Sequence, residues 1–383
     1  MVFDPFTIQV AEETLRDLRQ RLERVRWPDQ LPGDDWAYGT DLAYLQDIVA
    51  YWHDHYDWQA QQNLLNTYPQ FLTEIDGITL HFQHIKGKGT HTLPLIITHG
   101  WPGSFFEMYK IIGPLTDPAR YGGDPADAFD VVVPSLPGYG FSGPTLRRGI
   151  GPTQTTAAFA SLMHALGYER FGAQGSDWGS LISSQLASLY PDSVVGLHVD
   201  FLTPRVSYQV DEQNEETQRW RERLKNFSKE GAAYAHVHDT RPQTLAYGLN
   251  DSPVGLASWI IEMFHSWSDC HGDIESVFTK DELLTNIMIY WVTQTINSSM
   301  RFYYETSHQG EPFEGRIEVP TGIAVFPEDF SMPPQEVAQQ RYNIQRWTQM
   351  KAGGHYPALE QPQALVEDIR AFFRPLRNAR KDS

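Results

Sequence analysis

One pentapeptide, Gly175-Ser-Asp-Trp-Gly179, constrains the fold of this chain more than any other stretch. Glycines two positions before and two positions after Asp177 suit a sharp strand-to-helix turn that pushes one side chain outward, the arrangement called a nucleophile elbow. Centring the same frame on Ser176 would put Gln174 and Trp178 where small residues are needed, so the spacing selects Asp177. Taken alone, the pentapeptide fits equally well an Asp that only caps the following helix.

Composition excludes several classes of protein. The net charge of -18 argues against nucleic acid or an anionic membrane surface as partner, because both would repel the chain. A single cysteine, Cys270, rules out an internal disulfide and a cysteine-based metal site. The N-terminus has neither an apolar run nor a basic flank, which predicts no signal peptide, no membrane anchor and a soluble, cytoplasmic protein.

The periodicity of apolar residues changes along the chain. Helical spacing dominates residues 1–70, where the first helix is expected over residues 11–27, and this segment is predicted to form a helical arm. A strand pair turning at Asp76-Gly77 follows. Short, mostly apolar runs typical of buried parallel strands are then found at residues 95–99, 129–134, 194–201, 321–326 and 346–351, with a weaker one from residue 170 into the pentapeptide. Alternation of these runs with helical segments predicts a doubly wound α/β fold.

The segment from residue 204 to residue 311 lacks a parallel-strand pattern. Three helices are expected there, around Trp220, around Trp259 and around Trp291. The sequence therefore predicts three parts: the arm (1–70), an α/β core (71–203 and 312–383) and a helical lid inserted into the core (204–311).

Other candidate residues follow predicted strands. His99-Gly-Trp-Pro102 comes at the end of one strand, and the backbone amides of Trp101 and Trp178 could together bind a developing oxyanion. Late in the chain an acid in Phe326-Pro-Glu-Asp329 precedes His355, which gives the order nucleophile, acid, histidine. Three strand-end positions in this order predict a hydrolase with a catalytic triad.

Short stretches along the whole chain carry a family resemblance. They are Arg26-Trp-Pro28, His99-Gly-Trp-Pro102, Pro137-Gly-Tyr-Gly-Phe-Ser142, Gly175-Ser-Asp-Trp-Gly179, Leu249-Asn-Asp-Ser-Pro-Val-Gly-Leu256, Leu284-Thr-Asn286, Arg301-Phe-Tyr-Tyr304 and Gly353-Gly-His355. With these stretches the chain resembles the epoxide hydrolases of the α/β-hydrolase fold, in the microsomal-type and juvenile-hormone-type branch. The resemblance implies that two lid tyrosines grip the epoxide oxygen, at positions matching Tyr234 and Tyr303, with Tyr304 as a competitor for the second role.

The chemistry of an epoxide agrees with this interpretation. Its strained carbon can be opened by the Asp177 carboxylate, which leaves an alkyl ester on the enzyme. A tyrosine, with an ordinary pKa of about 10, can donate a proton to the departing oxygen. His355 would then activate a water that hydrolyses the ester. The predicted substrates are an apolar epoxide and water, the product is a vicinal diol, and no metal or organic cofactor is expected.

Several alternatives stay open at this stage. The acid that orients His355 is predicted to be Asp329, with Glu328 one residue short of it and Asp200 at the end of another strand as rivals. A haloalkane dehalogenase would use the same Asp nucleophile, and a serine esterase or a non-catalytic binding protein could share the fold. The lid and arm could also serve a partner interface, and a homodimer is compatible with the sequence.

Overall fold

A central β-sheet organises the computed structural model, which describes residues 1–33, 35–89, 91–209, 211, 213–310, 313, 315–330 and 332–378. The strand order is β1-β2-β3-β5-β4-β6-β7-β8-β9. The strands are β1 (Asp4–Phe6), β2 (Gln70–Ile75), β3 (Ile78–Ile85), β4 (Leu93–Thr98), β5 (Phe129–Pro134), β6 (Phe171–Gly175), β7 (Val194–Val199), β8 (Ile317–Val325) and β9 (Tyr342–Gln349). Strands β4 to β9 are parallel, and β1, β2 and β3 add an antiparallel edge. The predicted mostly parallel sheet is confirmed.

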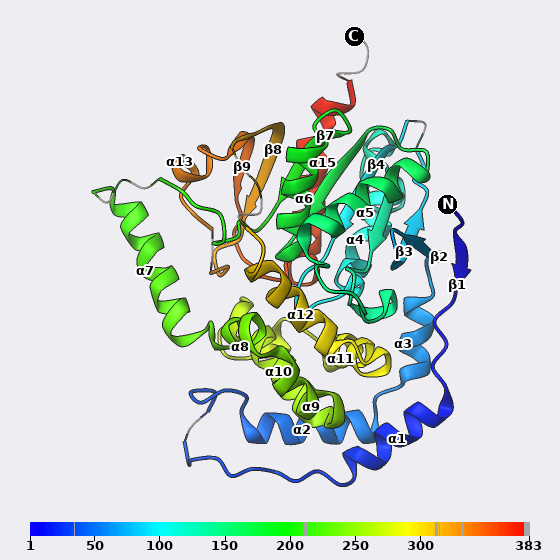
Figure 1. Ribbon diagram of the computed structural model, residues 1–383, viewed down its shortest axis with the longest axis vertical. Coiled ribbons are helices and arrows are strands. Elements are labelled where there is room, and N and C mark those ends of the chain that lie inside the picture. Colours follow the sequence, from blue (N-terminus) through cyan, green and yellow to red (C-terminus); the bar gives the residue numbers. More distant parts are fainter. Residues whose placement is uncertain are drawn as a thin grey trace.

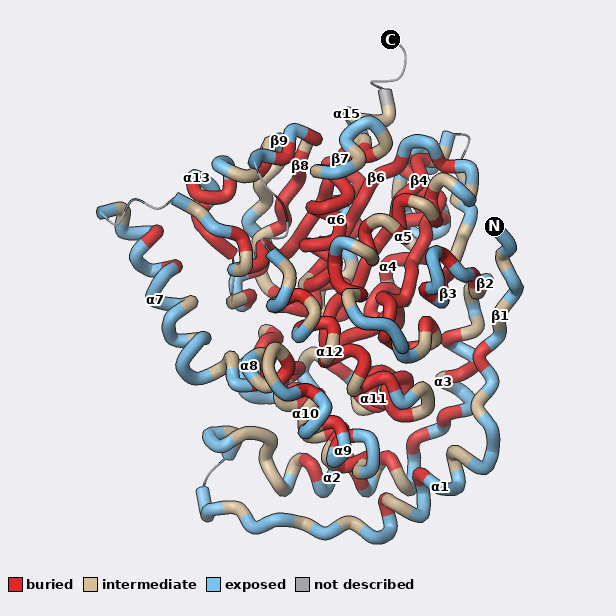
Figure 2. Tube along the Cα trace, viewed as in Figure 1, coloured by how far each residue is buried: buried red, intermediate tan, exposed pale blue. Residues whose placement is uncertain are grey.

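Helices cover both faces of the sheet, as a doubly wound fold requires (Figure 1). Helices α5 (Pro152–Ala165) and α6 (Trp178–Leu189) pack together on one face, and α4 (Tyr109–Thr116) and α15 (Pro362–Asn378) pack on the other. Two short helices, α13 (Gln335–Ala338) and α14 (Pro357–Glu360), complete the C-terminal part. Figure 2 shows that burial is concentrated in the sheet and in the helices against it. The central strands are buried on both faces because helices lie above and below them.

The register of the parallel strands brings their carboxyl ends to one edge. Thr98 pairs with Gly175, Gly175 with Val199, and Val199 with Ile323. Loops that follow these strands therefore meet at the same edge of the sheet, which is where ligands of open α/β sheets bind.

In the described part of the chain between β7 and β8 there are six α-helices, which we call the inserted helices. They are α7 (Glu215–Glu230), α8 (Ala233–Thr240), α9 (Pro242–Asp251), α10 (Pro253–Trp267), α11 (Lys280–Thr293) and α12 (Ile296–Ser307). Three of them, α7, α10 and α11, were expected. Helices α8 and α9 are short, and the buried positions of α12 mix hydroxyl and aromatic side chains with aliphatic ones, so these three helices are less apolar than α10 and α11.

The N-terminal segment holds α1 (Glu12–Leu22), α2 (Leu42–Asp54) and α3 (Trp58–Leu65), which run beside the inserted helices (Figure 1). Helices α1 and α2 both contact α10, and α2 and α3 contact α11. Three helices were expected in this segment and are present, and residues 4–6 add a strand that was not expected, β1, on the edge of the sheet against β2. Helix α1 also ends at Leu22 rather than near residue 27. The predicted boundary between residues 311 and 312 lies outside the described residues.

Candidate active site

Asp177 stands at the turn between β6 and α6, with the positive φ of 49° and ψ of -121°. An Asp in this region of φ/ψ space is strained, and such strain is typical of functional turns. A Cβ on Gly175 would lie 2.1 Å from the Gly179 carbonyl oxygen, and one on Gly179 would lie 1.9 Å from the Thr98 carbonyl oxygen. The two glycines therefore let the backbone pass close enough to form the elbow.

The Trp101 amide holds one oxygen of Asp177. Its N–H donates a 2.7 Å hydrogen bond to Asp177 Oδ1. The Trp178 amide, the second predicted oxyanion donor, opens helix α6 next to Asp177. The first N–H groups of a helix have no acceptor within that helix, so this amide and the positive end of α6 lie beside the nucleophile, and the Asp177 side chain does not cap them.

The loop that carries Trp101 is held by two residues that were not among the candidates predicted from the sequence. Asn286 Nδ2 donates to the Pro102 carbonyl at 2.8 Å, and the Tyr290 hydroxyl donates to the Gly103 carbonyl at 2.7 Å. Both residues lie on α11, so an inserted helix positions the loop of the core. The Leu284-Thr-Asn286 stretch noted in the sequence contains one of them.

His99, the buried residue that follows β4, holds the same loop in place. Its Nε2 accepts from the Leu136 N–H at 3.2 Å, and its Nδ1 contacts the Gly100 carbonyl at 3.0 Å. Burial lowers the pKa of His99 to about 4, so the neutral ring carries its proton on Nδ1 and donates it to Gly100. This bond orients the peptide group between Gly100 and Trp101, which also carries the Trp101 N–H.

His355 lies between two carboxylates. Its Nδ1 bonds to Asp329 Oδ2 at 3.0 Å, and its Nε2 lies 3.6 Å from Asp177 Oδ2. The two other candidates for the acid that orients His355 have different surroundings. Asp200 accepts from Gln174 Nε2 at 3.1 Å, and Glu328 is exposed, with its backbone N–H bonded to the Gly353 carbonyl.

The pKa values of His355 and Asp200 are both raised, for different reasons. Burial alone would lower the pKa of His355, but Asp329 and then Asp177 outweigh it and raise that pKa to about 10. Burial raises the pKa of Asp200 to about 7, which hydrogen bonds from Ser176 and Gln174 only partly offset. The Ser176 hydroxyl is thus bonded to Asp200.

Two of the three candidate tyrosines are buried against the tryptophans on either side of Asp177. Tyr234 on α8 is 7% exposed and stacks on the Trp101 ring at 5.1 Å, and Tyr303 on α12 is 3% exposed and meets the Trp178 ring edge-on at 4.7 Å. The two phenol rings lie 5.9 Å apart. Tyr304 points elsewhere, since it is 36% exposed and stacks on His308.

Burial raises the pKa of both inward phenols above their ordinary value, and the negative charge of Asp177 acts in the same direction. Both phenols therefore carry their protons at neutral pH. Each can donate a hydrogen bond toward an oxygen placed between the tyrosines and Asp177.

Metal-binding groups and membrane-spanning helices are both absent from the described part of the chain. Among the described residues, no group of three or more His, Cys, Asp or Glu side chains is placed to bind a metal ion. Nor does any helix in the described ranges combine the length and the apolar character needed to cross a bilayer.

Comparison with known proteins gives a consistent result. A family model described as "Epoxide hydrolase N terminus" matches residues 3–108, and one described as "alpha/beta hydrolase fold" matches residues 94–247. The chain is 39% identical over 399 residues to epoxide hydrolase 1 of Sus scrofa, a match that covers 96% of this chain and 88% of that protein.

Solved structures extend the likeness to three dimensions. The juvenile hormone epoxide hydrolase of Bombyx mori is 30% identical, with a TM-score of 0.88 and coverage of 99% of this chain and 95% of that one. The Aspergillus niger epoxide hydrolase is 29% identical, with a TM-score of 0.87 and coverage of 98% and 97%. The matches favour an epoxide hydrolase over the dehalogenase, esterase and binding-protein alternatives. This chain belongs to the epoxide hydrolases of the α/β-hydrolase fold, in the branch of the microsomal-type and juvenile hormone epoxide hydrolases.

Proposed function

We propose that the chain opens an epoxide through a covalent ester on Asp177, which water activated by His355 then hydrolyses. One observation carries this proposal. The Trp101 amide binds Oδ1 of Asp177, while Oδ2 faces His355. A bound oxygen stays the carbonyl oxygen of the ester, and the other oxygen is left to attack.

In the first step Asp177 Oδ2 forms a bond to an epoxide carbon, and the carbon–oxygen bond of the ring breaks. The departing oxygen takes a proton from Tyr234 or Tyr303. Both phenols are held protonated by burial, which supports their role as acids rather than as nucleophiles. The ring strain of the epoxide supplies the driving force, so the carboxylate needs no activating base.

The charge on His355 changes between the two steps. In the resting site the pKa of His355 is about 10, so the ring is protonated between the Asp177 and Asp329 carboxylates. An ester on Asp177 is neutral, and its formation removes one of the two charges that hold this proton. The pKa of His355 therefore falls, and the ring can pass its proton to the tyrosine phenolate left by the first step.

In the second step neutral His355 takes a proton from water, and the hydroxide adds to the ester carbonyl carbon. Negative charge develops on Oδ1, where the Trp101 and Trp178 amides stabilise it. The intermediate collapses, and the alkoxide leaves with the proton from His355. The Asp177 carboxyl group, which now holds one oxygen from water, then passes its proton to His355 and restores the resting pair. Asp329 keeps the imidazole oriented throughout.

We also propose that the inserted helices act as a lid over an α/β core, with residues 1–70 as an arm. This division is supported by the position of α7–α12 between β7 and β8. Both inward tyrosines also come from these helices, Tyr234 from α8 and Tyr303 from α12. A homodimer and a cytoplasmic location stay predictions, which light scattering on the purified protein and cell fractionation would measure.

Three substrates tested side by side would check the proposed activity. Styrene oxide should be converted to its diol, whereas chlorobutane and a nitrophenyl ester should give turnover no faster than an Asp177→Asn variant. Release of chloride at a rate similar to diol formation would instead indicate a dehalogenase.

A further inference from the structure

Arg205 links the two helices that carry the inward tyrosines. It lies in the segment that follows β7, and its guanidinium group reaches both α8 and α12. We propose that Arg205 is a positioning residue for ester formation, which fixes Tyr234 and Tyr303 relative to each other and so the place of the epoxide oxygen between their hydroxyls. The inference rests on the proposed function, in which both tyrosines act on that oxygen.

The guanidinium group bonds to one residue on each helix. Its Nη2 donates to both carboxylate oxygens of Asp239 on α8, at 2.9 Å and 3.1 Å, and its Nη1 donates to the Ser307 hydroxyl on α12 at 3.0 Å. The Ser307 hydroxyl in turn donates to Asp239 at 2.5 Å, which closes a triangle of three bonded side chains. A planar guanidinium fixes the direction of each bond that it donates. The triangle therefore joins α8 to α12 in one arrangement.

The bonded residues lie close to the tyrosines along each helix. Asp239 comes five residues after Tyr234 on α8, and Ser307 comes four residues after Tyr303 on α12. Four residues are about one turn of a helix, so each contact lies about one turn from a phenol. The two phenol rings meet edge-on with 5.9 Å between their centroids. Movement of α8 against α12 would change this spacing, and the triangle opposes that movement.

Arg205 also contacts the ring against which Tyr303 packs. Its guanidinium carbon lies 5.4 Å from the centre of the Trp178 ring, within the distance of a cation–π contact. The same indole meets the Tyr303 ring edge-on at 4.7 Å. Since Trp178 follows the proposed nucleophile directly, this contact ties the position of Tyr303 to the elbow that carries Asp177.

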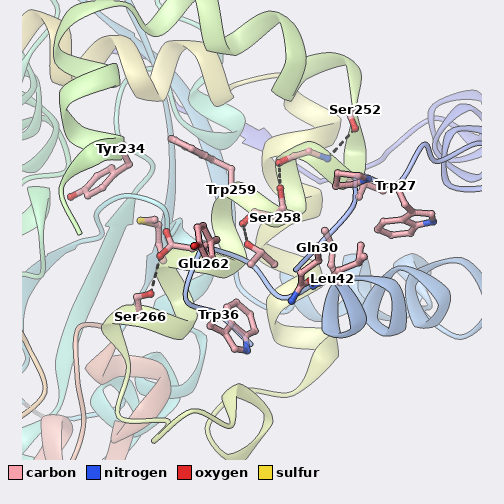
Figure 3. Close-up of a pocket in the computed structure, with 18 of the residues that line it drawn as sticks. Trp27, Gln30, Trp36, Leu42, Tyr234, Ser252, Ser258, Trp259, Glu262 and Ser266 are labelled. Atoms are coloured by element: carbon pink, nitrogen blue, oxygen red, sulfur yellow. Dashed lines mark hydrogen bonds between the residues drawn. The ribbon is translucent and has the colours of Figure 1, made fainter. Parts of the chain in front are cut away.

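The triangle lies outside the pocket that reaches Tyr234. Figure 3 shows Tyr234 and Trp259 among the residues that line this pocket, and its described lining does not include Arg205, Asp239 or Ser307. A substrate in the pocket therefore contacts Tyr234 but not the guanidinium group. Any effect of Arg205 on the reaction passes through the tyrosines that it positions.

The charge of Arg205 has opposed effects on the acid. Burial and then Asp177 raise the pKa of Tyr234, whereas Arg205 lowers it and Asp239 raises it. Because the two members of the ion pair act on this pKa in opposite directions, the geometry of the pair is its main contribution. A cation that cannot reproduce the geometry should therefore be a poor replacement.

The test measures ester formation and ester hydrolysis separately, by rapid quenching with styrene oxide and enzyme in excess. Arg205→Ala should slow ester formation about 10-fold, since misplacement of reacting groups by about 1 Å can cost about 100-fold. Ester hydrolysis should change by less than about twofold, because the contacts of His355 with Asp329 and Asp177 do not involve Arg205. Arg205→Lys should recover less than half of the loss, because an ammonium group lacks the planar fork.

Combined variants separate positioning from a general loss of stability. Asp239→Ala breaks the same triangle, so it should slow ester formation to a similar extent, and the Arg205→Ala/Asp239→Ala double variant should be little slower than either single one. In a Tyr303→Phe background, Arg205→Ala should slow ester formation by less than about twofold, because the pair that it aligns is already incomplete. Independent effects would multiply instead.

Arg374→Ala is the matched control, since Arg374 on α15 also bonds to both carboxylate oxygens of an aspartate, Asp127, and it should leave both steps unchanged. The inference would be overturned if Arg205→Ala left ester formation unchanged or slowed both steps equally. Full recovery in Arg205→Lys, or a full 10-fold effect in the Tyr303→Phe background, would overturn it as well. Each of these results would leave the epoxide hydrolase activity standing. An unmodified protein that forms no ester with styrene oxide would contradict the proposed function itself.

Discussion

The Trp101 amide and the Asp177 carboxylate form a 2.7 Å hydrogen bond, so one oxygen of the proposed nucleophile is occupied before substrate arrives. The other oxygen lies 3.6 Å from His355 Nε2. The two oxygens therefore have separate parts in the proposed mechanism, Oδ1 as the site of the later oxyanion and Oδ2 as the attacking atom.

Removal of the proposed base should separate the two steps. His355→Gln keeps Asp177 and both tyrosines, so the ester should still form, but its hydrolysis should slow sharply because no base activates water. Intact-mass measurement after mixing with styrene oxide should show a persistent adduct of one substrate. A variant that neither turns over nor acquires mass would place His355 in the first step.

The inward tyrosines should affect only ester formation. Tyr234→Phe and Tyr303→Phe each remove a proton donor from the epoxide oxygen, and each should slow the first step by about 10²-fold while leaving ester hydrolysis nearly unchanged. Rapid-mixing kinetics that follow the two steps separately would measure this. Tyr304→Phe is the matched control, since Tyr304 is directed away from the site, and a larger loss in it would contradict the assignment.

The acid that orients His355 can be identified among three carboxylates. Asp329→Asn breaks the 3.0 Å bond to His355 Nδ1 and should slow ester hydrolysis by at least about 100-fold. Asp200→Asn should cost much less, because Asp200 is bonded to Gln174 and its pKa of about 7 leaves it partly neutral at neutral pH. Glu328→Gln, at an exposed position, should be close to unmodified. If Asp200→Asn were the most damaging of the three, the proposed role of Asp329 would be wrong.

The proposed charge change at His355 can be measured without substrate. Asp177→Asn puts a neutral side chain where the ester would be, so the pKa of His355 should drop from its resting value of about 10. The sign follows from the cause, since a carboxylate near an imidazolium raises its pKa and loss of that charge lowers it. NMR titration of histidine-labelled protein would report the change, and an unchanged pKa would remove the argument that ester formation frees the base.

Local sequence patterns predicted much of the fold. The elements that were not predicted lack such patterns. The elbow was readable because Gly175 and Gly179 are needed for close backbone approach. Strand β1 was not predicted, because three residues are too few to show an alternation of apolar and polar side chains. Its pairing with β2 also joins segments far apart in the chain. The packing of α1 and α2 against α10 likewise joins segments far apart in the chain.

The candidate residues were predictable, but their geometry was not. Asp200 and Asp329 both follow parallel strands, and sequence spacing cannot say which of them reaches His355. Tyr303 and Tyr304 are neighbours on α12, where consecutive side chains of a helix point about 100° apart. Only the packing of α12 against Trp178 decides which one faces Asp177.

The central claim is that Asp177 forms a covalent ester, and oxygen labelling tests it most directly. Enzyme in excess over styrene oxide should be allowed a single turnover in heavy-oxygen water, followed by mass analysis of the diol and of the peptide that contains Asp177. Because water attacks the ester carbonyl and the diol keeps the Oδ2 oxygen, the label should enter the Asp177 carboxylate and the diol should be unlabelled. Label in the diol of the first turnover, with none in the peptide, would show that water opens the epoxide directly and would contradict this account.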